Sequence, residues 1–212
     1  MFKTTTTTQD FLKIEQIKDG IIVLKNKGLR MILAVSSLNF ALKSEEEQEA
    51  ILYGFQTFLN SLDFSCQILV NSKRLNITGY LDKLKEIEKK EKNELLKIQI
   101  KEYRNFIEEI LKGGSIMQKT FYVIVPFSLM EVSGIAVEKK FSKTTTLTEQ
   151  DFQRAKNQLL QRVEFVILGL RNCGLEAVPL NSLEIAELFW SLYHPIEAER
   201  GYYPEIPPEL VK

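Results

Sequence analysis

Apolar and polar residues alternate along the chain in runs that predict short strands, helices and the turns between them. Three strand-like runs open the sequence, at residues 11–17, 21–25 and 29–36, and Asp19-Gly20 and Asn26-Lys27-Gly28 separate them. Asn, Asp and Gly accept the positive φ angles that tight hairpin turns require. The pattern therefore predicts an antiparallel β-meander at the start of the chain.

A helix with a sharply defined start follows this meander. Ser44 and Glu47 have the spacing of a capping box, and the acidic residues beside them favour the positive end of a helix dipole. Helix-start chemistry accounts for this acidic cluster, so we expect no metal site there. Apolar residues then recur at helical spacing, which predicts a buried stripe, at Ile51, Leu52, Phe55, Phe58, Leu59 and Leu62.

The middle of the chain predicts a strand and a helical insertion. Residues 64–70 alternate as a strand does, with Phe64, Cys66, Ile68 and Val70 on one face. Thr78 is expected to cap a helical lobe over about residues 78–112, which Gly113-Gly114 ends. Residues 88–94 carry no apolar side chain, so either one long solvated helix crosses them or two helices meet near Asn93.

The second half predicts a further strand–helix–strand–helix series. A strand at 120–125 is closed by Pro126, and residues 127–146 are expected to form a loop or a mobile hairpin. Thr148 and Asp151 start a helix, a short strand follows at 175–178, and Asn181 or Ser182 caps a last helix that ends before Pro195. The long helix has an apolar stripe at Phe152, Ala155, Leu159, Val163, Val166 and Leu170.

This order, βββαβ, a helical insertion and βαβα, predicts an α+β fold. We expect a mixed or antiparallel sheet, covered on one face, with ferredoxin-like split βαβ units after the N-terminal meander. A single domain would span residues 10–195, between a disordered arm at 1–9 and an extended, Pro-rich tail at 196–212.

Composition narrows the chemistry that the chain can carry. The 212 residues include 28 basic and 28 acidic side chains, so no net field steers the protein toward nucleic acid or anionic lipid. Cys66 and Cys173 lie far apart, and His194 is the only histidine, which leaves no zinc pattern. We expect two buried free thiols, a histidine that caps a helix end, and no metal or cofactor.

Residues 113–120, GGSIMQKT, nearly match the phosphate-binding pattern GxxxxGK[ST], with Gln118 in place of the second glycine. A phosphate loop follows a strand and opens a helix, whereas here a helix precedes the segment and a strand follows it. The segment is therefore interpreted as the end of a helix that leads into a strand. No pattern predicts catalytic residues, and we expect the chain not to be an enzyme.

Lysines in the helical lobe suggest a rival function, the binding of single-stranded nucleic acid. Interspersed glutamates nearly cancel their charge, which weakens phosphate attraction. A solvated helix face is the simpler interpretation. The basic residues are Lys83, Lys85, Lys89, Lys90, Lys92, Lys97, Lys101 and Arg104.

Two long segments resemble a known family. Residues 29–77, which begin LRMILAVSSLNFALKSEEEQEAILYGFQTFLNSL, and residues 155–181, AKNQLLQRVEFVILGLRNCGLEAVPLN, are similar to the TraC-like domain. Residues 93–103 and 119–126 fit the same pattern, so the resemblance covers about residues 10–195. That domain resembles the N-terminal, non-motor region of conjugative type IV secretion ATPases.

The resemblance implies a non-catalytic scaffold or adaptor of a conjugation-like type IV secretion apparatus. Its expected location is cytoplasmic, peripheral at the inner membrane, where it would dock a separate motor ATPase to a small membrane subunit or to copies of itself. The alternative is a single-stranded nucleic-acid-binding accessory protein in DNA transfer. Candidate partner contacts lie in the tail, at Tyr202, Tyr203, Ile206 and Pro207, which would either dock in a partner groove or fold back onto the domain.

Overall fold

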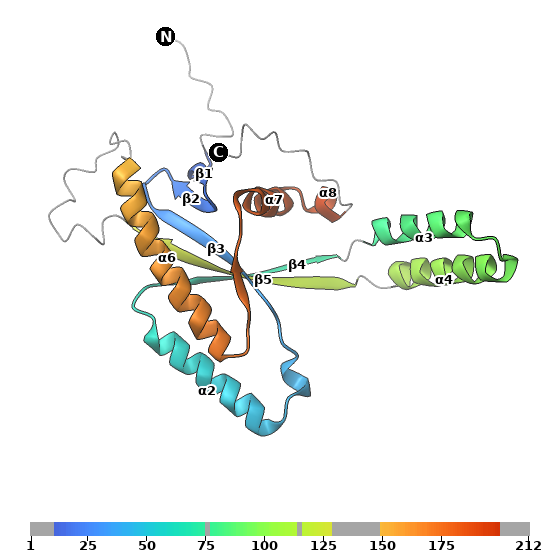
Figure 1. Ribbon diagram of the computed structural model, residues 1–212, viewed down its shortest axis with the longest axis horizontal. Helices are drawn as coiled ribbons and strands as arrows, with labels where there is room; N and C mark the ends of the chain where they lie inside the picture. Colours follow the sequence, from blue (N-terminus) through green and yellow to red (C-terminus); the bar gives the residue numbers. More distant parts are fainter. Residues whose placement is uncertain (1–10, 75–76, 114–115, 129–148, 200–212) are drawn as a thin grey trace, which may run out of the picture. The chain divides into compact units, whose positions relative to one another are not determined.

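A computed structural model describes residues 11–74, 77–113, 116–128 and 149–199. The chain forms two compact units (Figure 1). Among the described residues, the first unit comprises 11–70 and 120–186, and the second comprises 71–119 and 187–199. The first unit contains most of the sheet and the helices α2 (Glu45–Ser61) and α6 (Glu149–Asn172), and the second contains the helical insertion.

The predicted meander is confirmed. It consists of β1 (Ile14–Lys18), β2 (Ile21–Leu24) and β3 (Leu29–Val35), each antiparallel to the next. Asp19 and Gly20 join the first two strands with φ angles of 54° and 72°. A Cβ on Gly20 would lie 2.8 Å from the Leu180 carbonyl oxygen, too close for a side chain. Glycine therefore suits this position both because of the positive φ angle and because there is no room for a Cβ.

Three further strands complete a six-stranded sheet: β4 (Gln67–Arg74), β5 (Met117–Phe127) and β6 (Ala177–Pro179). The strand order is β1-β2-β3-β5-β4. On the side of β3 that faces away from β5, β2 pairs with the first residues of β3 and β6 pairs antiparallel with its last residues. The four strands β3, β4, β5 and β6 are the first to fourth of a ferredoxin-like unit in chain order. In space they lie in the order β6-β3-β5-β4, or 4-1-3-2, which is the ferredoxin-like arrangement. The predicted α+β class is confirmed.

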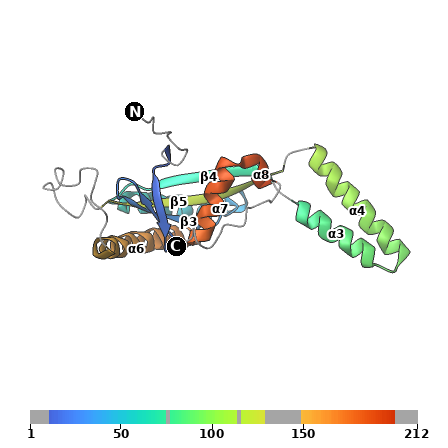
Figure 2. The ribbon, with the colours of Figure 1, turned by 90° about the horizontal axis from the view of Figure 1, so that it is seen from above.

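The long helix α6 (Glu149–Asn172) lies against one face of the sheet (Figure 2) and forms the core with it. All six residues of its predicted stripe are buried. They pack with alternating residues of the strands, among them Ile21, Leu33 and Val125, each fully buried. Because successive strand residues point to opposite faces, this alternation defines the face that α6 covers.

The opposite face is also buried at the centre of the sheet. Ile22 and Ile32 alternate with the core residues of β2 and β3, and they are only 3% and 4% exposed. The expectation of a sheet covered on one face is therefore wrong for these two strands.

Helix α2 (Glu45–Ser61) starts as predicted but packs differently. Ser44 and Glu47 form the expected capping box, in which each side chain bonds the backbone N–H of the other residue. Phe58 is the one buried residue of the helix, whereas Leu52 and Leu59 are 58% and 46% exposed. The predicted stripe is thus only partly buried, because α2 packs mainly on α6.

Gly169 of α6 makes the contact between these two helices possible. A Cβ at this position would overlap the ring of Phe58. The ring therefore occupies the space that a side chain would fill, and the two helices approach closely at this point.

The last helices are α7 (Ser182–Tyr193) and α8 (Pro195–Glu199). Asn181 caps α7, since its Oδ1 accepts from the N–H of Glu184 at 2.9 Å and Glu184 accepts from the N–H of Asn181 at 2.8 Å. Ser182 has another role, because its Oγ accepts a bond from the N–H of Gly20 at 2.9 Å. The stretch predicted as an extended tail begins with α8, since proline suits the first position of a helix.

The helical insertion is a hairpin of α3 (Thr78–Lys90) and α4 (Glu94–Gly113), which lie side by side in Figures 1 and 2. The break near Asn93 is confirmed, and Oδ1 of Asn93 caps α4 by accepting from the N–H of Leu95 at 3.0 Å. The predicted cap at Thr78 is wrong. Thr78 is the first helical residue, and Ile77 occupies the cap position without a side-chain bond.

Two strand boundaries also differ from the prediction. The strand β4 begins at Gln67 instead of residue 64, and its residues Ile68 and Val70 are 58% and 52% exposed. Pro126 lies inside β5, opposite Arg30, and does not close the strand. Only one residue of β5 follows it, so its missing N–H costs the ladder little.

We predict that Gly169→Ala destabilises the protein by about 1–3 kcal/mol, because the new methyl group overlaps the Phe58 ring. Gly54→Ala in α2 is the matched control. Its Cβ would meet ordinary contacts at 3.5 and 3.7 Å, so it should be neutral or stabilising by up to about 1 kcal/mol. Urea denaturation followed by circular dichroism measures both values, and equal effects would contradict the packing described.

Acidification should weaken the ion pair between Asp19, in the β1–β2 turn, and Lys156 of α6. Lys156 Nζ donates to the Asp19 carboxylate at 2.7 Å, and this bond holds the pKa of Asp19 below its usual value. Because the pKa of Asp19 is lower in the folded protein than in the unfolded chain, where it is about 3.9, ionised Asp19 stabilises the fold. This stabilisation is complete above the unfolded pKa and is lost as the pH falls through the folded pKa. The melting temperature of Asp19→Asn should therefore lie below that of the wild type at neutral pH and approach it below about pH 4. A difference that persists in acid would contradict this account.

Candidate docking pocket

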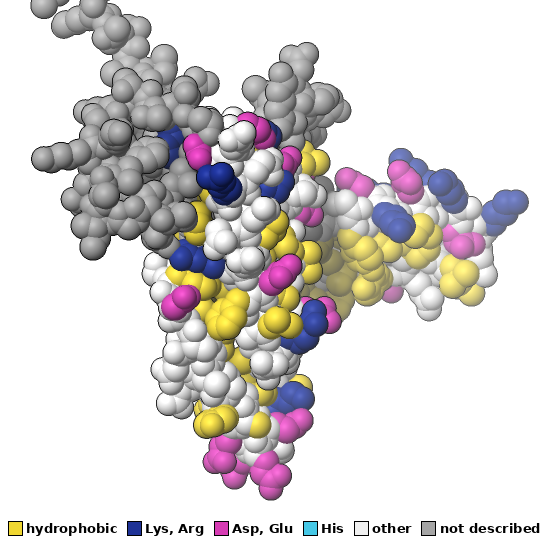
Figure 3. Space-filling model, turned by 60° about the vertical axis from the view of Figure 1, so that its left-hand side comes forward, with side chains coloured by type: hydrophobic (Ala, Val, Ile, Leu, Met, Phe, Trp, Pro, Cys, Tyr) yellow, Lys and Arg dark blue, Asp and Glu magenta, His cyan; other side chains and the backbone are white. Residues whose placement is uncertain are grey.

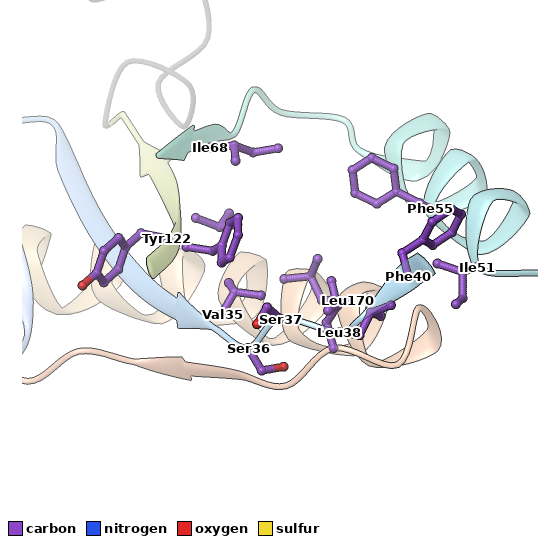
Figure 4. A pocket seen from close by; sticks show the side chains of 13 residues that line it. Val35, Ser36, Ser37, Leu38, Phe40, Ile51, Phe55, Ile68, Tyr122 and Leu170 are labelled. Carbon is purple, nitrogen blue, oxygen red and sulfur yellow. The ribbon is translucent and has the colours of Figure 1, made fainter. Parts of the chain in front are cut away.

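An apolar pocket of about 330 Å³ opens in the first unit, between α2, α6 and the sheet (Figure 4). Its walls come from β3, β4, β5, both helices, the segment that links β3 to α2, and Leu175. The lining residues are Val35, Ser36, Ser37, Leu38, Phe40, Ile51, Phe55, Ile68, Phe121, Tyr122, Val123, Leu170 and Leu175.

The segment after β3 forms one fixed wall of this pocket. Ser36 donates its N–H to the carbonyl of Glu176 at 2.8 Å, and its Oγ accepts from the N–H of Glu176 at 2.8 Å. The short 3₁₀ helix η1 (Phe40–Leu42) follows and brings Phe40 to the rim, where it is 37% exposed. These bonds hold the wall in place without any contact from a ligand.

The opposite wall comes from α2 and β4. Ile51 and Phe55 extend from α2, and Ile68 extends from the edge strand β4 (Figure 4). Phe55 packs against Phe58 with 6.1 Å between the ring centroids, so it is anchored at the buried point of the helix. Two residues of the predicted α2 stripe, Ile51 and Phe55, thus line the pocket.

The pocket is suited to an apolar group. Among the lining residues, only Ser36, Ser37 and Tyr122 have polar side-chain groups. Its volume lies at the lower end of the range for small-molecule sites, about 300–1,000 Å³. A large aromatic or aliphatic side chain of a partner helix is of suitable size.

A second, polar hollow of about 430 Å³ shares Leu38 and Ile51 with the pocket. Lys43 and Glu47 line it and form an ion pair at 3.1 Å. The Ser44 N–H, and then Lys43, hold the pKa of Glu47 below its usual value, so the carboxylate is charged at neutral pH. An apolar pocket beside charged groups is the usual layout of a docking site with a polar rim.

The two thiols are free, as predicted, although Cys66 is only half-buried. Burial raises the pKa of Cys173, and it raises that of Cys66 against the opposing charge of Arg162. An activated nucleophile requires the opposite direction, a lowered thiol pKa.

The other sites considered from the sequence have structural roles where the structure describes them. The segment 113–120 runs from the end of α4 into β5, with Lys119 and Thr120 inside the strand, so the predicted order of helix then strand is confirmed. His194 lies at the end of α7, where its Nδ1 is 3.3 Å from the Trp190 carbonyl and its ring stacks on the Trp190 ring.

Some predicted features lie outside the described residues. They are the arm at 1–9, the tail contacts Tyr202, Tyr203, Ile206 and Pro207, and all but the first two residues of the predicted loop 127–146. Within the described ranges, no group of three or more His, Cys, Asp or Glu side chains is placed to hold a metal ion. None of the helices described is long and apolar enough to span a bilayer.

The fold and the pocket define a class: an α+β module with a ferredoxin-like strand order and an apolar pocket beside the sheet. The family model of the archaeal TraC-like domain matches residues 14–195, and the chain belongs to this family. Membership suggests a role related to conjugation or type IV secretion. No curated protein and no solved structure matches the chain.

Sequence reasoning did not find the pocket, because its residues come from five separate stretches of the chain, at 35–40, 51–55, 68, 121–123 and 170–175. One signal was present in the sequence. The α2 stripe has six apolar residues, more than a helix that packs along one line against α6 can bury.

We predict that a neutral apolar dye such as N-phenyl-1-naphthylamine binds in the pocket and gains fluorescence. Phe55→Arg and Ile68→Arg should each abolish most of this gain, because an arginine places charge in the apolar space. Leu168→Arg is the control, since Leu168 is an apolar residue of α6, 56% exposed, that does not line the pocket. A signal that survives both pocket substitutions would show that the dye binds elsewhere.

Proposed function

We propose that this TraC-like chain is a non-catalytic docking module of a conjugation-like type IV secretion apparatus. It holds a separate motor ATPase against a small subunit of the cytoplasmic membrane, and it acts on the cytoplasmic side. The observation that carries the proposal is the family match over residues 14–195, joined to an apolar pocket on the matched domain.

The pocket supplies the binding mode in this proposal. A short amphipathic helix of the membrane subunit inserts one large apolar side chain between Phe55 and Ile68. Polar residues that flank this side chain meet the rim at Lys43 and Glu47. A buried apolar anchor with a polar rim gives most of the binding energy to one or two residues.

The chemistry of the candidate groups supports a role without turnover. The nearest approach to a phosphate loop, residues 113–120, runs from a helix into a strand, the reverse of the order that phosphate binding uses. Both thiols have raised pKa values. A rigid domain that presents surfaces to two partners needs neither nucleotide nor metal.

The test is a binding titration with the small membrane subunit and the motor ATPase of the same apparatus, the subunit held in nanodiscs. We expect the wild-type chain to bind the subunit, and Ile68→Arg to weaken this binding at least about tenfold through the loss of an apolar anchor. Leu168→Arg should bind as the wild type does. Equal binding by all three proteins would contradict the pocket as the docking site.

Two further measurements separate the proposal from its rivals. The isolated chain should hydrolyse no ATP. It should also bind single-stranded DNA weakly at physiological salt, because acidic residues intersperse the basic ones of the hairpin. Tight, salt-sensitive DNA binding would favour the nucleic-acid-binding function instead, and ATP hydrolysis by the purified chain would overturn the non-catalytic role.

A further inference from the structure

The hairpin of α3 and α4 is held together by one seam of side chains. On α3 the partly buried residues of this seam are Leu81, Leu84 and Glu88, and on α4 they are Ile100, Arg104 and Ile107. They are three and four residues apart, the spacing that keeps one helix face on its neighbour. Arg104 and Glu88 form an ion pair at 3.6 Å within it.

Each helix also carries a second apolar seam beside the first, and this outer seam is exposed. On α3 it contains Tyr80 and Ile87, seven residues apart, and on α4 it contains Leu96, Tyr103, Phe106 and Ile110. These six side chains are between 41% and 57% exposed. The hydroxyls of Tyr80 and Tyr103 lie 3.4 Å apart, so the two halves form one surface.

Two seams on each helix are more than a hairpin requires. A two-helix hairpin buries one stripe per helix, whereas each helix of a four-helix bundle packs against two neighbours and needs apolar residues along both. Such bundles use a repeat of seven residues. The outer seam has this spacing, from Tyr80 to Ile87 on α3 and from Leu96 to Tyr103 to Ile110 on α4. Hydrophobic side chains gather on this hairpin in Figure 3, bordered by Lys and Arg.

Charged residues along the outer seam indicate what covers it. Lys83 and Lys90 lie three residues after Tyr80 and Ile87, on the flank of α3. On α4, Glu102 lies four residues before Phe106 and Glu109 lies three residues after it, on the flank beside the seam. All four side chains are exposed, and none forms an ion pair with a described residue.

We infer that the outer seam pairs with the outer seam of a second copy of this chain, so that α3 of each copy lies on α4 of the other. The basic flank of α3 then meets the acidic flank of α4 in both halves of a four-helix bundle. Tyr80 and Tyr103 lie at the same height along the two helix axes, since their hydroxyls are bonded. Lys83, three residues after Tyr80, and Glu102, one residue before Tyr103, therefore lie at similar heights along the hairpin. An anionic membrane would instead require basic residues on both flanks.

Sedimentation of the purified full chain, from about 1 to about 100 µM, tests this pairing. We expect a concentration-dependent dimer. Phe106→Lys should raise the dissociation constant at least about tenfold, because it places a charge in the apolar seam. Lys101→Glu is the control on the same helix, since Lys101 is exposed and lies on the face of α4 opposite Tyr103 and Ile110. Circular dichroism verifies that both variants keep their helices.

A charge exchange identifies the partner as a second copy. The variant K83E/K90E has acidic flanks on both helices, and E102K/E109K has basic flanks on both, so each alone should dimerise at least about tenfold more weakly than the wild type. Their equimolar mixture should form a heterodimer as tight as the wild-type dimer. A wild type that stays monomeric, or a mixture that shows no recovery, would overturn the inference.

Two other occupants give distinct outcomes. A monomer that floats with anionic vesicles through Phe106 would assign the seam to a membrane. A monomer that binds the secretion subunits through Phe106 would assign it to another protein. Either result overturns the pairing of copies, and neither bears on the apolar pocket, so this inference and the proposed function fail separately.

Discussion

The contact between Phe58 and Gly169 determines where α2 lies, and the pocket depends on it. Phe58 is the buried residue of α2, and its ring fills the space where α6 lacks a side chain. The helix therefore packs mainly on α6. Ile51 and Phe55, which a sheet contact would bury, instead line a hollow whose far side is the edge strand β4. The absence of a side chain at position 169 thus favours an apolar pocket elsewhere in the unit.

The helical insertion leaves apolar surface for a different reason. Its two helices pack through one seam that contains the ion pair of Arg104 and Glu88, and the second seam stays outside. The pocket is a small apolar hollow, whereas the outer seam is a long apolar surface along two helices, and the two share no residues.

The element order could be predicted from the sequence because each element carries its own local signals. The turn at Asp19-Gly20, the box of Ser44 and Glu47, and the six-residue stripe of α6 are all determined within a few residues. The strand order of the sheet followed from that element order. The class of fold was therefore predictable, and the family match agrees with the resemblance found in the sequence.

The remaining features depend on contacts between distant residues. Nothing near Phe58 indicates that Gly169, more than one hundred residues later, will receive its ring. Nothing near Ser182 indicates that its hydroxyl will bond Gly20 and leave the cap to Asn181. Ile68 and Val70 alternate as buried residues do, but their exposure follows from their place on the edge strand β4. Tertiary position overrides local pattern at these points.

The most direct test of the docking account is methyl NMR of the chain as the small membrane subunit is added. The account predicts that the methyl signals of Ile51, Ile68 and Leu170, which line the pocket from three elements, shift together while that of Leu168 stays in place. Shifts confined to methyl groups away from the pocket, with these three unchanged at saturation, would contradict it.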